Sequence, residues 1–236
     1  MKSDNKAKVK KYLENIMHER ERTNLLRKYE QMLITYLVQR IPEWISSNML
    51  TAIGYFGNVI IFIAFILAKN FHIYYLLLGV LGFAVSWFGD SLDGRIAYYR
   101  NKPRKWFGFS LDLTVDWLGI ILLGWGFVIY TGDIWELLGF LFVVLYGWEM
   151  LTALLRYKIT NNYSIDSGLM GPTEVRIVIS GFLILEVLVP ESIIYSVIIA
   201  CVLLLITNIL DTVKLLKLAN ARDKEEKLQG KTNSSN

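Results

Sequence analysis

Four aspartates in two short segments are the side chains of this sequence best suited to chemistry. Asp90 and Asp93 lie three residues apart, and Asp112 and Asp116 lie four residues apart. Residues at these spacings share one face of an α-helix, so each pair projects from a single helical surface. A short basic segment at 95–105 separates the pairs. We therefore expect two antiparallel neighbouring helices that bring the four carboxylates together.

Residues with little or no side chain accompany these acids. Gly94 and Ala97 lie four and seven residues after Asp90, and Gly108 lies four residues before Asp112. At such positions a nucleotide or a neighbouring helix can approach the backbone closely. The pattern therefore combines acidic ligands with space beside them.

A cluster of four carboxylates needs cations to balance it, because like charges at close range repel. Hard divalent cations prefer oxygen ligands, so four aspartates would balance two Mg²⁺ or Mn²⁺ ions. Two such ions can clamp a pyrophosphate and stabilise displacement at phosphorus. The chain has two histidines, so a His-rich metal site is excluded.

Other interpretations of the acids stay open at this stage. Each of them could cap a helix or lie in a loop at a membrane edge, and together they could form a protonatable transport pathway. An intramembrane aspartyl protease fits less well. That class usually needs a Gly-x-Gly-Asp element, and the run Phe88-Gly89-Asp90 lacks the first glycine.

Six apolar stretches place the acids in a membrane. Hydrophobic residues make up 54% of the 236 residues. Three stretches without Lys, Arg, Asp or Glu are close to the ~20 residues that cross a bilayer core, and they lie at 49–68, 71–89 and 192–210. Three more, interrupted by isolated acids or bases, lie at roughly 106–131, 134–157 and 171–189. The sequence predicts an all-α integral membrane protein with six transmembrane helices.

The positive charges gather on one side of this arrangement. Of the 25 Lys and Arg residues, 24 lie in residues 1–47, 95–105, 156–176 and 214–231, and the remaining one is Lys69. By the positive-inside rule, both termini and the two basic loops face the cytoplasm, as an even number of spans requires. Juxtamembrane charge accounts for the net charge of +4, so we expect no nucleic-acid partner.

The segments outside the spans divide the chain into three parts. Residues 1–47 form a cytoplasmic and interfacial region, because an apolar stripe with helical periodicity at 25–44 would lie on the cytoplasmic leaflet as an amphipathic helix. A cytosolic helix packed on the protein's own loops is the alternative. Residues 48–219 form the six-helix transmembrane domain that carries the candidate site. The polar residues 220–236 are predicted to be a disordered cytoplasmic tail.

The two acidic segments together resemble the signature of the CDP-alcohol phosphotransferases, also called CDP-alcohol phosphatidyltransferases. That family carries D-x-x-D-G-x-x-A-R and, after a short gap, G-x-x-x-D-x-x-x-D; this chain matches seven of the eight fixed positions. Tyr98 stands where the family has arginine, and the spacing to Gly108 is one residue longer. Arg95 or Arg100 could supply the missing positive charge, or the chain could contact the donor phosphate differently.

A second element near the first span extends the resemblance. Asn48 and Thr51 are similar to the family's P-N-x-x-T element, with Ser47 in place of the proline. The resemblance thus covers the first three predicted spans by motif and the rest by topology. The CDP-binding residues that it implies are Asn48, Thr51, Asp90, Gly94, Ala97 and Gly108.

The resemblance also implies an enzyme with defined roles for the acids. Asp90, Asp93 and Asp112 would be the main ligands of two Mg²⁺ or Mn²⁺ ions. Asp116 would complete the metal site and act as general base on the acceptor hydroxyl. The implied partners are a CDP-linked lipid, an alcohol acceptor, membrane lipids and a second copy of the chain in a homodimer.

Basic residues near the ends of the fourth and fifth predicted spans are candidates for binding the acceptor. Arg156, Lys158 and Arg176 would suit an acceptor that carries a phosphate, although snorkelling at span ends explains them equally well. We expect a phospholipid-biosynthetic transferase that moves a phosphatidyl group from CDP-diacylglycerol to a polar alcohol of the inositol phosphate or glycerol phosphate type, releasing CMP. The alternatives are a CDP-choline or CDP-ethanolamine phosphotransferase acting on a lipid alcohol, and an intramembrane divalent-cation carrier.

Overall fold

The computed structural model describes residues 27–160 and 171–233, and these residues form helices and short turns without a strand. Residues 1–26, which hold most of the predicted N-terminal region, lie outside the described part. The helices are α2 (Arg27–Val38), α3 (Ser47–Asn70), α4 (Leu76–Tyr99), α5 (Lys105–Thr131), α6 (Glu136–Thr160), α7 (Pro172–Leu188) and α8 (Ser192–Asn233), with the 3₁₀ turns η1 (Ile73–Tyr75) and η2 (Asp133–Trp135).

Among the described residues, five helical segments are long and apolar enough to cross a membrane, which supports the prediction of an all-helical, multi-pass membrane protein. They are Ser47–Asn70, Ile73–Tyr99, Lys105–Thr131, Asp133–Thr160 and Ser192–Leu228. Helix α7 lies where another span was predicted, but it has 17 residues. At 1.5 Å per residue it covers about 26 Å, somewhat less than the ~30 Å bilayer core. The count of six spans therefore stays a prediction.

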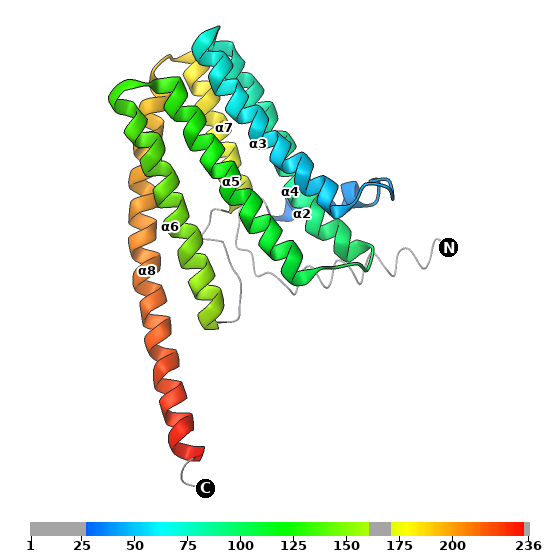
Figure 1. The fold of residues 1–236 in the computed structure, drawn as a ribbon, viewed down its shortest axis with the longest axis vertical. Helices are drawn as coiled ribbons and strands as arrows, with labels where there is room; N and C mark the ends of the chain where they lie inside the picture. Colours follow the sequence, from blue (N-terminus) through cyan, green and yellow to red (C-terminus); the bar gives the residue numbers. More distant parts are fainter. Residues whose placement is uncertain (1–26, 161–170, 234–236) are drawn as a thin grey trace.

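Helices α3 and α4 lie side by side and approach each other closely through glycines (Figure 1). A Cβ atom on Gly57 would lie 2.4 Å from the backbone nitrogen of Ser86, and one on Gly89 would lie 2.2 Å from the backbone nitrogen of Gly54. These distances are shorter than any stable contact, so only glycine fits at this packing. The close approach fixes α4, and with it the first acid pair, against α3.

Helix α3 also packs on α5 and so contacts both helices that carry the acids. The short connection after α4 turns at Asn101, whose φ of 56° is left-handed, a conformation that Asn adopts more readily than most residues. The two acid-bearing helices therefore share few direct contacts, because each packs mainly on α3, but they approach each other at the acids as expected. We call the end of the bundle at which residues 100–104 join α4 to α5 the site end.

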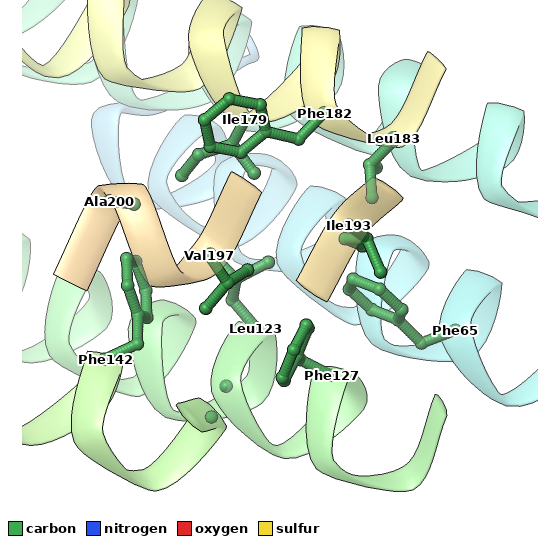
Figure 2. Close-up of a pocket in the computed structure, with 12 residues that line it drawn as sticks. Phe65, Leu123, Phe127, Phe142, Ile179, Phe182, Leu183, Ile193, Val197 and Ala200 are labelled. Atoms are coloured by element: carbon green, nitrogen blue, oxygen red, sulfur yellow. The ribbon is translucent and has the colours of Figure 1, made fainter. Parts of the chain in front are cut away.

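The opposite half of the bundle contains an apolar cavity (Figure 2). Its lining side chains come from α3, α5, α6, α7 and α8, and include Phe65, Phe127, Phe142 and Phe182. Leu123 in this lining is seven residues beyond Asp116, which is about 10 Å along α5. The cavity is thus separate from the acids, and its lining has no charged residue.

Helix α2 covers the site end of α4. Its buried residues Ile34 and Val38 belong to a small core with Leu50, Leu92 and Ile96. A second apolar stripe on α2 is exposed, and consists of Tyr29, Met32, Leu33 and Tyr36. The helix is shorter than the predicted 25–44 segment and packs partly on the protein itself. Contact of its exposed stripe with a membrane surface stays a prediction.

Helix α8 extends well beyond the other helices at its C-terminal end (Figure 1). The polar segment 220–236 was predicted to be disordered, but α8 continues through it to Asn233. Contacts of Arg222 help to hold this part of the chain in a helix. Its side chain pairs with Glu226 at 2.9 Å and donates to the carbonyls of Lys158 and Ile159 at 3.0 and 2.6 Å, which ties α8 to the end of α6.

Candidate active site

Three of the four predicted aspartates converge at the site end. Asp90 comes from α4, and Asp112 and Asp116 come from successive turns of α5. Each offers a carboxylate oxygen, and these oxygens lie within 4.8 Å of one another. Carboxylate oxygens at this separation can ligate one hard divalent cation together. The residues therefore fit a metal site of the kind that the sequence predicts.

Asp93 is beside this group, but its carboxylate is engaged by the protein. The hydroxyl of Thr51 on α3 donates to its Oδ2 at 2.6 Å, and the backbone N–H of Gly94 donates to its Oδ1. Both Thr51 and Asp93 are buried. A hydrogen bond to a charged group in such a place is strong, so Thr51 fixes the orientation of Asp93 relative to α3.

Arg176 on α7 brings a positive charge to the acids. Its Nη1 lies 2.7 Å from Oδ2 of Asp90, and its Nη2 lies 3.9 Å from Oδ1 of Asp116. The side chain of Arg176 is 16% exposed, so the guanidinium itself is largely shielded from water. The guanidinium therefore balances part of the negative charge of the cluster and links α7 to α4 and α5.

The start of α7 is built so that Arg176 reaches the cluster. Pro172 occupies the first turn, where a missing N–H costs nothing. Glu174 accepts a hydrogen bond from the backbone N–H of Gly171 at 3.1 Å, which caps the helix. Thr173 donates to Glu30 on α2 at 3.1 Å. Helix α2 thus contacts both α4 and α7, which carry acids and the arginine respectively.

Tyr146 on α6 is a site residue that the sequence analysis missed. Its phenol is buried and interacts electrostatically with Asp116, Arg176 and Asp90. The sequence offers no signal for this, because a tyrosine within a long apolar stretch looks like any residue that faces lipid or a helix. Helix α6 thus contributes a phenol to the electrostatic surroundings of the acids.

The predicted CDP-binding residues lie around the acids. Asn48 is near the start of α3, and its Oδ1 accepts a hydrogen bond from Arg104. A Cβ atom on Gly94 or on Gly108 would meet nothing within 4 Å among the described residues. Ala97 lies one turn beyond Gly94 on α4 and is half-buried. The two glycines therefore face open space beside the acids, as a bound ligand would require.

The three basic residues proposed to bind the acceptor do not gather at one place. Only Arg176 reaches the acids. Arg156 pairs with Asp211 on α8 at 3.2 Å, and both side chains are largely buried. The side chain of Lys158 is exposed on the last turns of α6. The prediction that Arg156 and Lys158 contact an acceptor therefore has less support from the structure than the same prediction for Arg176.

Comparison with known proteins gives one finding. A sequence model of the family described as CDP-alcohol phosphatidyltransferase matches residues 44–213. The match covers 170 of the 236 residues and includes the four aspartates, Asn48, Thr51 and Arg176. A search of curated proteins found no match.

Proposed function

Because the chain belongs to the CDP-alcohol phosphatidyltransferase family, we propose that it moves a phosphatidyl group from CDP-diacylglycerol to the hydroxyl of a polar alcohol, releasing CMP. Family membership confirms the resemblance of the acidic segments, and it supports phosphatidyl transfer from a CDP-linked donor within a membrane. The observation that carries the proposal is the convergence of Asp90, Asp112 and Asp116 beside an arginine and open space.

The acids would hold the divalent cations that the family generally uses. Asp90, Asp112 and Asp116 offer oxygens close enough to share an ion, and Asp93 lies beside them. Two Mg²⁺ or Mn²⁺ ions would balance the four carboxylates. Bound there, the ions would neutralise the donor pyrophosphate and stabilise the charge that develops on the leaving CMP.

Asp116 is the proposed general base. Its side chain is 35% exposed, against 25% for Asp90, so it is the more accessible of the two acids that pair with Arg176. It would accept the proton of the acceptor hydroxyl. The freed oxygen would bond to the phosphorus that carries diacylglycerol, and the bond from that phosphorus to the CMP oxygen would break.

Arg176 is the residue that supports an acceptor with a phosphate. Its guanidinium is next to the proposed base and has five N–H donors in a planar fork that matches phosphate oxygens. An inositol phosphate or glycerol phosphate would place its hydroxyl near Asp116 if its phosphate were held by Arg176. Arg156 and Lys158, on the last turns of α6, remain proposed acceptor contacts on the sequence alone.

The surroundings of the site suggest how the enzyme lies in the membrane. We extend the proposal to six spans with α7 as the additional one, with both termini and the site end in the cytoplasm, where the Lys and Arg residues concentrate. The exposed apolar stripe of α2 would rest on the cytoplasmic leaflet. Assembly as a homodimer is proposed from the family resemblance alone.

A matrix of donors and acceptors tests the proposed function. The purified full chain in liposomes would be given CDP-diacylglycerol or CDP-choline with Mg²⁺ or Mn²⁺, and either water-soluble acceptors or diacylglycerol. The soluble acceptors would be inositol phosphate, glycerol phosphate, serine and inositol. We expect CMP release with CDP-diacylglycerol and a phosphorylated acceptor. Turnover of CDP-choline with diacylglycerol would favour the alternative phosphotransferase, and ion flux without CMP release would favour a cation carrier.

A further inference from the structure

Tyr98 replaces the arginine of the family signature, and two nearby arginines have partners elsewhere. The guanidinium of Arg100 binds backbone carbonyls between α2 and α3, and its acceptors are Ile41, Pro42, Glu43 and Ile45, at 3.2, 2.8, 3.3 and 2.5 Å. Arg95 donates from Nη1 to the carbonyl of Ser91 in its own helix at 2.6 Å. Arg100 therefore acts as a structural residue, because its hydrogen bonds hold the segment that leads into α3.

Arg104, which was not among the candidates from sequence, has the geometry of a ligand-binding arginine. It immediately precedes α5 and is exposed, and its Nη2 donates to Oδ1 of Asn48. Its guanidinium carbon lies 4.3 Å from the ring centroid of Phe107, which supports the planar group from one side. Because Asn48 takes one of five N–H donors, most of them remain available to a ligand.

The contact between Arg104 and Asn48 begins a row of polar groups that leads to the acids. Asn48 and Thr51 lie three residues apart on α3, about 4.5 Å along its axis. Thr51 donates to Asp93 at 2.6 Å. The row thus joins the starts of α5 and α3 to Asp93 on α4. A nucleoside diphosphate held at the acids could extend along this row.

We propose that Arg104 binds the nucleotide phosphate of the donor and supplies the positive charge that Tyr98 does not. The inference rests on the proposed function, because it takes the donor to be a CDP-linked lipid. A planar guanidinium suits phosphate oxygens, and its contact with Asn48 holds it beside the residue proposed to bind CDP. With Oδ1 of Asn48 accepting from Arg104, the amide Nδ2 of Asn48 is left as a donor to the ligand.

The test compares CMP with cytidine as probes, because they differ only in the phosphate. Calorimetric titration of the purified full chain would give both affinities for the wild type, Arg104→Gln and Arg104→Lys. Lys102→Gln is the matched control, since Lys102 is an exposed cation in the same connection. We expect Arg104→Gln to weaken CMP binding roughly tenfold or more, as loss of a hydrogen bond between charged groups implies. Cytidine binding should stay unchanged, Arg104→Lys should fall between, and Lys102→Gln should resemble the wild type.

Three results would overturn the inference. CMP affinity of Arg104→Gln within about twofold of the wild type would exclude the contact. An equal loss in Lys102→Gln would show that only general positive charge matters. An equal loss for cytidine and CMP would show that Arg104 acts only by positioning Asn48. Thermal melts would confirm that each variant is folded. If the wild type itself neither bound CMP nor released it from CDP-diacylglycerol, the proposed function would fail instead, so the two failures are distinguishable.

Discussion

Replacement of Gly89 by alanine should inactivate the enzyme although this glycine need not touch a substrate. A Cβ atom at Gly89 would lie 2.2 Å from the backbone nitrogen of Gly54 and 2.4 Å from the carbonyl oxygen of Leu50. Both atoms belong to the α3 backbone and cannot rotate away. Ordinary contact begins at 3.4 Å, so α3 and α4 would have to separate by about 1.2 Å.

This separation is large compared with the geometry of the site. A shift of 1.2 Å directed along the bond between Thr51 and Asp93 would lengthen it from 2.6 Å to about 3.8 Å, beyond hydrogen-bond range. Overpacking of this kind costs about 1–3 kcal/mol of stability. A displacement of about 1 Å in catalytic groups can cost about 100-fold in rate. We therefore expect Gly89→Ala to melt at a lower temperature and to release CMP about 100-fold more slowly.

Gly94→Ala should leave stability unchanged but weaken binding of the nucleotide. A Cβ atom there meets no described atom within 4 Å, so its melting temperature should equal that of the wild type. If the donor occupies the space beside Gly94, the added methyl group should instead weaken CMP binding. Gly181→Ala on α7, which also meets no described atom within 4 Å and lies away from the acids, is the control for both variants. It should match the wild type in melting and in CMP release.

The assays are thermal melts in detergent, calorimetric CMP binding and CMP release from CDP-diacylglycerol in liposomes. Wild-type stability and activity in Gly89→Ala would refute the close packing of α3 on α4 as the device that positions Asp93. A destabilised Gly94→Ala with unchanged CMP affinity would refute the assignment of open space at this residue to the donor.

Three further substitutions test contacts at and beyond the acids. Thr51→Val removes the hydroxyl that orients Asp93, and the loss of about 1.5–3 kcal/mol should lower the rate of CMP release at least tenfold. Arg176→Gln removes a cation that competes for the carboxylates, so binding of Mn²⁺, followed by electron paramagnetic resonance, should become tighter. Asp211→Asn leaves Arg156 without its partner and should lower stability by about 3 kcal/mol, seen as a lower melting temperature, because both groups are largely buried.

Each of these has a control or a contradicting result. Thr51→Ser keeps the hydroxyl and should retain most of the activity, and equal activity of Thr51→Val would dismiss the contact as a catalytic requirement. Weaker Mn²⁺ binding in Arg176→Gln would mean that Arg176 orients the ligands and does not compete with the metal. Lys214→Gln removes an exposed partner of Asp211 and should leave the melting temperature nearly unchanged. An Asp211→Asn protein as stable as the wild type would argue against the role of the α6–α8 ion pair.

The spans and the acid cluster could be predicted from sequence because local patterns encode them. An apolar stretch at roughly 106–131 becomes α5 (Lys105–Thr131), since a predominantly apolar run of this length is stable only as a helix in a membrane. The spacing of Asp112 and Asp116 puts both on one helical face. Four carboxylates at these spacings are best balanced by divalent cations, so the sequence could indicate metal-assisted transfer before the family was identified.

The arrangement of side chains between helices could not be predicted in the same way. Nothing local in the sequence distinguishes Arg176, which reaches the acids, from Arg156, which pairs with Asp211. The choice depends on how α7 and α8 pack on the other helices. The close packing of α3 on α4 likewise depends on glycines whose partners lie some 30 residues away in the chain. The polar composition of residues 220–236 led to a wrong prediction of disorder. Helix α8 continues through most of this segment, where Arg222 donates to backbone carbonyls of α6.

The most direct test of the account is CMP release from CDP-diacylglycerol by the wild type and by Asp116→Asn, measured with a phosphorylated acceptor in Mn²⁺ and again in EDTA. The account predicts that the wild type releases CMP only when the divalent cation is present. It also predicts that Asp116→Asn still binds CMP but releases almost none, because the proton of the acceptor hydroxyl has no base to receive it. Undiminished release by Asp116→Asn, or equal release by the wild type in EDTA, would contradict the proposed site.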